Sequence, residues 1–281
     1  MIEEKRRESD TEMGFCHEYR GQLEYLTIPA FAQAGFCHAF STRHGGVSQG
    51  ELGSLNLGFS RGDERENVLE NYRRLTQAIG VSMDSLVLAA QTHTDRIRKV
   101  TRADCGEGIT KKTFADIDGL MTDETGVTLV TFHADCTPVF LADPIRRAVA
   151  LVHAGWRGTV QNIAGKAVAA MMQEYGCRPQ DILAAIGPGI CPQCFETHED
   201  VPNAMMAALG TPVLQHIQIK DNGKFSVDLK GINAMRLEQA GLDPAKIAIS
   251  RECTSCRTDK YWSHRKVGNN RGSMASVIQL L

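Results

Sequence analysis

Residues 127–153 read VTLVTFHADCTPVFLADPIRRAVALVH and contain three short apolar runs with no helical pattern between them. The runs Val127–Phe132, Pro138–Leu141 and Ala148–His153 have the length and composition of buried strands. Asp143 and Pro144 supply a turn before the third run. Strands joined by such short connections pair antiparallel, so this stretch predicts the antiparallel part of a β-sheet.

Strands and helices alternate in the rest of the chain. Further strand-like segments are Leu86–Gln91, Ile182–Ile186, Lys246–Ser250 and Ser273–Leu281. Helices are expected over residues 63–80, 159–175 and 228–241, with Asp63 and Asp228 as N-caps and glycine at the ends. Helices between strands favour some parallel pairing. The sequence therefore predicts an α+β (mixed α/β) fold, with mixed β-sheet layers covered by helices.

Composition and charge exclude several classes of protein. The chain has 281 residues, 42% hydrophobic and 23% charged, so it is long enough for a sizeable core. Its 31 Lys and Arg against 33 Asp and Glu do not favour binding to nucleic acid by bulk charge. We expect a flexible leader over residues 1–14 and a single catalytic domain over residues 15–281, because no linker-like stretch or internal repeat follows.

The N-terminal segment MIEEKRRESDTEM has no apolar core and does not resemble a secretory signal. No stretch approaches the ~18 apolar residues of a membrane span. The nine cysteines, an odd number, are then expected to be free thiols in the cytoplasm, and no membrane partner is expected. The oligomeric state stays open.

Three segments place His or Cys at the end of a predicted strand. They are QTHTD (91–95), HADCTP (133–138) and HAGWRG (153–158), the last leading into a predicted helix N-terminus that favours anions. Taken singly, each side chain is more often a structural residue than a ligand. Sequence spacing cannot bring His93, Cys136 and His153 together, and no HExxH motif is present.

Two CxxC pairs are a weaker signal for a metal. Cys191 and Cys194 form one pair, and Cys253 and Cys256 form another that begins 62 residues later. This interval exceeds the usual one in zinc ribbons, so unligated thiols are preferred over a structural Cys₄ zinc site. The GxSxG pattern at 46–50 lacks the strand-to-helix context of a hydrolase nucleophile and is set aside.

Seven stretches in order carry a family resemblance: FSTRHGGVSQGELGSLNLG, ENYRRL, QTHTDRI, DIDGLMTDETGVTLVTFHADCTPVFLAD, ALVHAGWRGTV, AIGPGICPQCFE and ISRECTSCRTDKYWSHRKVGNNRGSMASVI. Through them the chain resembles the purine nucleoside phosphorylases long called laccase-domain, polyphenol oxidase or YfiH-like proteins, which include peptidoglycan editing factors. The resemblance implies a zinc-dependent phosphorylase acting on adenosine and inosine, and also on methylthioadenosine, with adenosine deaminase activity beside it.

The resemblance also implies site residues. It carries the metal ligands over to His93, Cys136 and His153, and it marks Arg43 and Asn56 as further functional residues. The family also has cysteines near Cys194, Cys253 and Cys256 without a second zinc being implied, which lowers the expectation of a Cys₄ site. The metal is expected to be zinc, because two imidazoles and one thiolate with an open fourth position form the pattern of a catalytic zinc site.

The chemistry of phosphorolysis suggests roles for the other residues. Arg43 and Arg157 are the cationic donors available to hold phosphate. Asp135 or His133 could supply a proton to the leaving purine, and the sequence does not decide between them. Purine nucleosides and phosphate are therefore the expected partners.

Three alternatives stay open at this stage. One is an amidase that edits peptidoglycan precursors, using the metal or Cys136 as a nucleophile activated by His93. Another is a copper-dependent phenol oxidase, which is less favoured because nine scattered histidines are too few for a multicopper site, although a single site could bind copper. The third is a metal-binding protein without catalytic activity.

Overall fold

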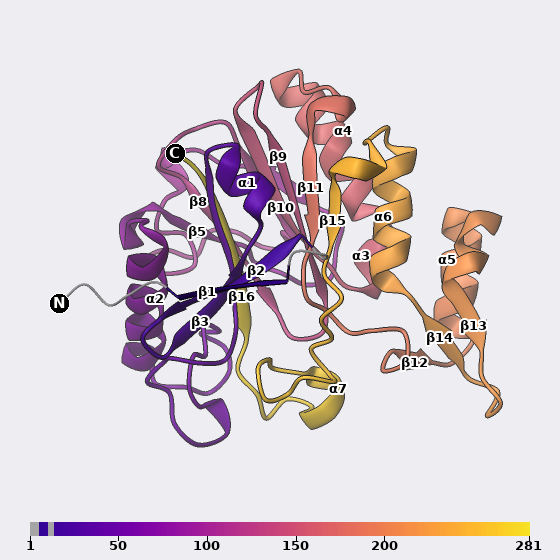
Figure 1. Cartoon of the computed structure of the whole chain (residues 1–281), viewed down its shortest axis with the longest axis horizontal. Coiled ribbons are helices and arrows are strands. Elements are labelled where there is room, and N and C mark those ends of the chain that lie inside the picture. The colour runs from indigo at the N-terminus through magenta and orange to yellow at the C-terminus, as the bar shows by residue number, and fades with distance from the viewer. Residues whose placement is uncertain (1–5, 11–13) are drawn as a thin grey trace.

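The computed structural model describes residues 6–10 and 14–281, and two packed β-sheets form its centre (Figure 1). Within these residues, one sheet has seven strands in the order β1-β2-β3-β4-β16-β8-β5. Their bounds are Arg6–Asp10, Phe15–Arg20, Leu23–Thr27, Phe36–Ser41, Met274–Leu280, Thr128–His133 and Leu86–Leu88.

The second sheet has six strands in the described part of the chain, in the order β15-β11-β9-β10-β7-β6. Their bounds are Ile247–Ile249, Leu183–Ile186, Thr137–Asp143, Ala148–Ala154, Gly119–Thr122 and Ile97–Lys99. A small sheet of the same described range joins β12 (Glu196–Thr197), β14 (Phe225–Val227) and β13 (Ile217–Ile219). The pairs β5–β8, β6–β7 and β11–β15 are parallel and the other pairs are antiparallel, which confirms the predicted mixed sheets.

Both faces of the central strands are covered, which explains their nearly continuous apolar sequence. All seven residues of β9 and all seven of β10 are buried. Along β9, Phe140 and Ala142 pack between the two sheets, whereas Val139 and Leu141 face the helices. An antiparallel strand therefore lacks the usual polar alternation here, because water reaches neither face.

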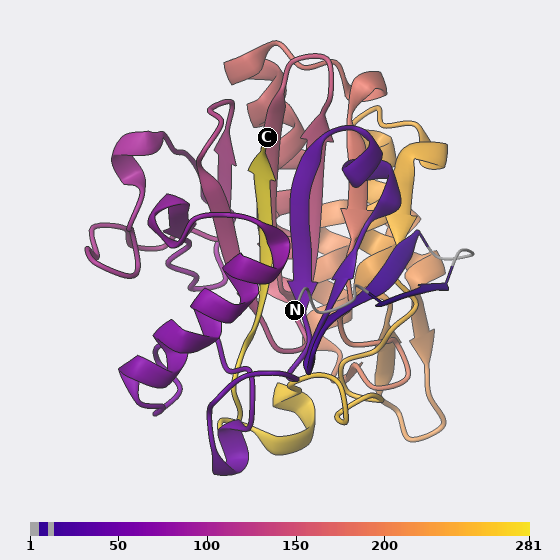
Figure 2. The same ribbon diagram turned by 60° about the vertical axis from the view of Figure 1, so that its left-hand side comes forward.

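Helices cover the outer faces of the two sheets. The helix α2 (Arg65–Ile79) packs Val68, Tyr72 and Leu75 on the seven-stranded sheet. The helices α4 (Ile163–Tyr175) and α6 (Leu229–Gln239) cover the six-stranded sheet, on the opposite side of the molecule (Figures 1 and 2). The remaining α-helices are α1 (Pro29–Gln33), α3 (Trp156–Val160), α5 (Asp200–Leu209) and α7 (His264–Val267).

Two of the expected helix boundaries are wrong. The helix predicted over 159–175 is divided into α3 and α4 at Asn162, which has the left-handed backbone conformation with φ of 61°. The cap of α2 is Glu64, not Asp63, because the Asp63 carboxylate accepts hydrogen bonds from Ser48 and Asn56 instead. The third helix does begin at its predicted cap, where Asp228 accepts from the amide of Gly231.

The N-terminal segment contains an ordered strand. Arg6–Asp10 form β1 and pair antiparallel with β2 along all five residues, whereas residues 1–5 and 11–13 of the expected leader lie outside the described part. In the residues that the structure describes, no helix combines the length and the apolar character required to span a bilayer.

Candidate active site

The pairing of β9 with β10 brings the second and third sequence segments together. Pro138 lies opposite His153, and Thr137 lies opposite Ala154. Cys136 immediately precedes β9, so it lies beside the end of β10, where His153 is the penultimate residue. The structure thus places the second and third segments at strand ends, as predicted, and the sheet register brings Cys136 and His153 together, which sequence spacing could not. The first segment does not lie at a strand end, because β5 ends at Leu88 and not at Gln91.

Asp118 brings in the first segment. This fully buried residue precedes β7, and its Oδ1 lies 2.8 Å from Nδ1 of His153. Its carboxylate also accepts from the backbone amides of Thr92, His93 and Thr94 at 3.0, 3.1 and 2.9 Å. These bonds hold the turn in which His93 has a left-handed conformation with φ of 67°. One carboxylate therefore fixes both histidines, although the sequence analysis did not single it out.

The three ligand atoms of His93, Cys136 and His153 lie within 4.8 Å of one another, and Nε2 of His93 is 4.0 Å from Sγ of Cys136. Zinc bond lengths of about 2.0–2.3 Å place donor atoms roughly 3.3–3.8 Å apart in a tetrahedron. Since Asp118 occupies Nδ1 of His153, the Nε2 atom remains for a metal. A metal-binding histidine usually has such a carboxylate partner, so the residues fit a zinc ion.

The electrostatics of the site favour a thiolate. Burial raises the pKa of Cys136, but His153 and His93 outweigh it and lower this pKa to about 6. Burial likewise lowers the pKa of His153, but Cys136 and Asp118 raise it to about 9. A thiolate is the form of cysteine that binds metal, whereas His153 has to release its Nε2 proton when the ion binds.

A cavity of about 970 Å³ contains these ligands in its wall. Two further residues expected from the sequence, Asp135 and Arg157, also line it. Arg157 is exposed and lies over the Trp156 ring at 4.4 Å. Aromatic rings form much of the remaining wall, at Phe59, Phe114, Phe132, Trp156 and Phe195. The cavity therefore combines a metal site with flat apolar surfaces suited to a purine.

The structure does not bring Arg43 to the metal ligands. Arg43 does not line this cavity; its guanidinium donates to the carbonyl oxygens of Gly53 and Thr258 and lies 3.8 Å over the Trp262 ring. The Gly-rich loop that holds Arg43 folds toward the C-terminal segment instead. Its donors satisfy backbone carbonyls, which is a structural function.

Asn56 is also outside the cavity lining. It is fully buried, its Oδ1 accepts from the amides of Gly58 and Ser273, and its Nδ2 donates to Asp63. It therefore joins the loop after Leu57 to the segment before β16. Both of these segments place an arginine in the cavity.

Asp135 and His133 are already engaged by protein groups. The Asp135 carboxylate accepts from Thr254 Oγ1, Ser263 Oγ and the amide of Arg265. The ring nitrogens of His133 contact Thr131 Oγ1 and the carbonyl of Cys136, and burial lowers its pKa well below the usual range. These contacts orient both side chains in the cavity wall.

Three arginines that the sequence analysis did not assign line the cavity. Arg265 donates to the carbonyl oxygens of Cys194 and Glu196, which leaves Arg61 and Arg271. Their Nε atoms are buried, and no group among the described residues accepts a hydrogen bond from either atom. Burial and the nearby charge of Arg61 lower the pKa of Arg271 to about 10, whereas Asp135 and Cys136 act in the opposite sense. Two adjacent guanidinium groups with free donors favour an anion.

Gly155 provides a steric test of the metal site. A Cβ atom at this position would lie 3.0 Å from Cys136 Sγ and 3.0 Å from His93 Cδ2. Its φ of −74° suits alanine, so the cost of Gly155→Ala falls on the ligands and not on the backbone. We expect weaker metal binding with little loss of stability, measured by metal titration and thermal unfolding.

Gly126→Ala is the matched control. Gly126 has φ of 74° and no crowding near its Cβ, so alanine strains the backbone by about 1 kcal/mol far from the ligands. This variant should lose stability and keep its metal. Equal metal affinity in Gly155→Ala and the wild type would contradict the placement of the ligands.

Asp118→Asn tests the shared carboxylate. The amide group cannot accept all of the bonds that Asp118 receives, so both histidines should lose their orientation. We expect metal affinity to fall by about 10- to 100-fold, measured by competition with a chromophoric chelator. Asp116→Asn is the control, because an amide oxygen can still accept the bond from Thr92 Oγ1 and only the pairing with the exposed Arg96 at 3.7 Å is weakened, so affinity should stay unchanged. The same affinity in both variants would exclude this function of Asp118.

Comparison with known proteins identifies the family. Residues 37–281 match the family described as multi-copper polyphenol oxidoreductase laccase. The chain is 36% identical over 266 residues to the purine nucleoside phosphorylase YlmD of Geobacillus stearothermophilus, covering 94% of this chain and 96% of that protein. It is 34% identical to the adenosine deaminase RL5 of an unknown prokaryotic organism, covering 83% of this chain and 90% of RL5.

A solved structure shows the same fold. The crystal structure of YlmD from Geobacillus stearothermophilus superposes with a TM-score of 0.87 at 34% sequence identity, covering 94% of this chain and 98% of that chain. The chain therefore belongs to the laccase-like family of multi-copper polyphenol oxidoreductase domains, several of whose members are named purine nucleoside phosphorylases.

Proposed function

We propose that this protein is a zinc-dependent purine nucleoside phosphorylase that acts on adenosine and inosine, and also on methylthioadenosine. The observation that carries the proposal is a single cavity that contains a His₂Cys ligand group, two arginines with free donors and several aromatic rings. The names of relatives such as YlmD support it. The cavity would hold the three parts of the reaction: the purine base, the phosphate and a Lewis acid.

The residues would divide the work as follows. Arg61 and Arg271 bind phosphate through charge-assisted hydrogen bonds and hold it against C1′ of the ribose. Aromatic rings such as Phe132 and Trp156 bind the purine and exclude water. His93, Cys136 and His153 would hold zinc, which supplies a Lewis acid with an open coordination position.

In this proposal Arg61 and Arg271 bind phosphate, the function that the sequence suggested for Arg43. Arg271 keeps its proton at neutral pH, since its lowered pKa of about 10 is still well above 7. Arg157, exposed at the cavity wall, remains available to contact the substrate. We propose adenosine deamination as a second activity, because the relative RL5 is named an adenosine deaminase and a metal site of this type serves that reaction.

A substrate panel tests the proposal. Purified protein loaded with zinc is incubated with inosine or adenosine plus phosphate, with a peptidoglycan precursor, and with a phenol after copper loading. We expect free purine base and ribose 1-phosphate from the nucleosides. Release of an amino acid from the precursor, or phenol oxidation with no nucleoside cleavage, would instead support the amidase or the oxidase and overturn the phosphorylase assignment.

A further inference from the structure

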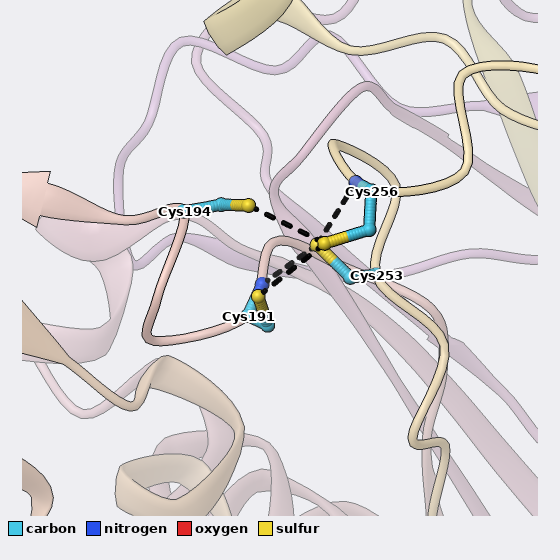
Figure 3. A group of neighbouring side chains, drawn as sticks. All are labelled: Cys191, Cys194, Cys253 and Cys256. Carbon is cyan, nitrogen blue, oxygen red and sulfur yellow. Dashed lines mark hydrogen bonds between the residues drawn. The ribbon is translucent and has the colours of Figure 1, made fainter.

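The two CxxC pairs meet in space, although 62 residues separate them in the sequence. The sulfur atoms of Cys191, Cys194, Cys253 and Cys256 lie within 4.8 Å of one another, and Figure 3 shows them converging from two loops. The first loop follows β11 and the second follows β15, and these two strands are parallel neighbours. The sheet topology therefore places the two pairs side by side.

The distances between the sulfurs fit a metal better than a disulfide. Cys194 Sγ is 3.5 Å and Cys191 Sγ is 3.9 Å from Sγ of Cys256. Four thiolates at about 2.3 Å from a zinc ion have sulfurs roughly 3.8 Å apart, whereas a disulfide bond is about 2.05 Å long. All four cysteines are free, and the group already has nearly the spacing of a tetrahedral site.

Backbone amides are directed at the first cysteine of the second pair. The amide of Cys191 donates to Sγ of Cys253 at 3.1 Å, and the amide of Cys256 donates to the same sulfur at 3.4 Å. Such bonds stabilise a thiolate, and here they come from both loops. Two amide donors on one sulfur favour its thiolate form, which a neutral structural thiol does not require.

A buried cation, Lys230, lies near the four cysteines. The ammonium group of Lys230 donates to the carbonyl oxygens of Ser250 and Glu252 at 2.7 and 3.1 Å, and the side chain is only 6% exposed. Four thiolates with one divalent cation carry a net charge of −2, which is costly to place beside an apolar cluster without a nearby positive charge. Cys253 belongs to such a cluster, with Ile190, Phe195 and Val201, and Lys230 offsets part of that charge.

We propose that Cys191, Cys194, Cys253 and Cys256 bind one zinc ion in a closed Cys₄ site, separate from the His93, Cys136 and His153 group. Binding releases the proton of each thiol and requires no redox step. A site with four protein ligands leaves no open position, so this zinc is structural. The proposal does not depend on the reaction that the protein catalyses.

This zinc would fix one wall of the catalytic cavity. Ile190 and Phe195, on either side of the first pair, line that cavity. Thr254, inside the second pair, donates to Gly189 through its amide and to Asp135 through its hydroxyl group. A metal that joins the two loops therefore restrains the segment beside Cys136. Its loss should loosen the substrate site without removing a catalytic ligand.

Metal analysis of matched variants tests the proposal. The proteins are purified with a phosphine reductant, saturated with zinc, freed of excess metal and analysed by plasma mass spectrometry. We expect about two zinc ions per chain in the wild type, about one in Cys194→Ser/Cys256→Ser and about one in Cys136→Ala. Cys105→Ser, which alters a thiol outside both groups and keeps a hydroxyl donor for Ser85 O, should retain two.

Cobalt substitution supplies a second readout. Cobalt bound by thiolates has a sulfur-to-metal charge-transfer absorption whose intensity rises with the number of thiolates. Most of it should therefore persist in Cys136→Ala, and only the contribution of Cys136 should remain in the double serine variant. If that variant does not fold, Cys256→Ser alone, at an exposed position, gives the same comparison. One zinc in the wild type that the double serine variant retains, a charge-transfer band unchanged by the serine substitutions, or a disulfide mass loss of about 2 Da in the isolated protein would each overturn the proposal.

These results stay separate from the proposed function. Two zinc ions per chain without nucleoside cleavage would reject the phosphorylase and keep the Cys₄ site. One zinc per chain with full phosphorolysis, retained in the double serine variant, would reject the Cys₄ site and keep the phosphorylase.

Discussion

Replacing Cys136 with alanine is expected to release the catalytic zinc and to lower kcat/KM for inosine and phosphate by more than about 100-fold. Even a partner outside the coordination sphere costs about 10- to 100-fold when it is removed, so a direct ligand should cost more. His93 and His153 alone leave two ligands, too few to hold the ion against a chelator. The measurement is steady-state phosphorolysis together with the metal content of the same preparation.

The fold should survive this substitution. Cys136 is not among the residues of the apolar clusters of the two sheets, and its strand-end position depends on the pairing of β9 with β10. Cys37→Ser is the control, because the thiol of Cys37 donates to the carbonyl of Ile79 and a hydroxyl group can do the same. Wild-type activity in Cys136→Ala would show that the reaction takes place without this metal site.

Replacing Arg271 with lysine is expected to lower kcat/KM for phosphate by about 10- to 100-fold while zinc content stays at the wild-type level. Lysine keeps a charge but loses the planar pair of donors. Hydrogen bonds to charged groups contribute about 1.5–3 kcal/mol each, which corresponds to this range. Arg61→Lys should have an effect of similar size, since both guanidinium groups are proposed to hold the same phosphate.

Arg43→Lys separates this account from the sequence-based one. Its contacts with the carbonyls of Gly53 and Thr258 are structural, so the variant should unfold at a lower temperature. Its phosphate dependence should stay that of the wild type. Adenosine deamination consumes water and not phosphate, so it should fall less than phosphorolysis in Arg271→Lys. A lower kcat/KM for phosphate in Arg43→Lys alone would show that Arg43 is the residue that holds phosphate.

The sheet layers were predictable because local sequence determines them. The apolar runs of β8, β9 and β10 are bounded by turns, and a covered strand is apolar on both faces. The break at Asn162 was not predictable, because no proline or glycine marks it and the Asn162 side chain accepts a hydrogen bond from Arg236, which is 74 residues away in the sequence. The cap of α2 was mistaken because tertiary bonds to Ser48 and Asn56 compete for Asp63.

The candidate ligands came from the family resemblance, and the register of β9 with β10 together with the Asp118 carboxylate explains why they meet. Asp118 was missed because an aspartate before a strand has no distinctive spacing, although it bonds to both His153 and the His93 turn. Arg61 and Arg271 were missed for a similar reason. They approach each other only because Asn56 joins their segments through Gly58 and Ser273. Asn56, which the family motif marked as functional, thus holds together the two loops that carry these arginines.

The most direct test of the central claim is the fate of the ribose when purified, zinc-loaded protein cleaves inosine over a phosphate titration. We predict one ribose 1-phosphate for each hypoxanthine, a rate that saturates with phosphate, and almost no cleavage in phosphate-free buffer. Free ribose formed at the same rate with and without phosphate would show that water is the nucleophile, and would contradict a cavity in which Arg61 and Arg271 hold phosphate beside the metal.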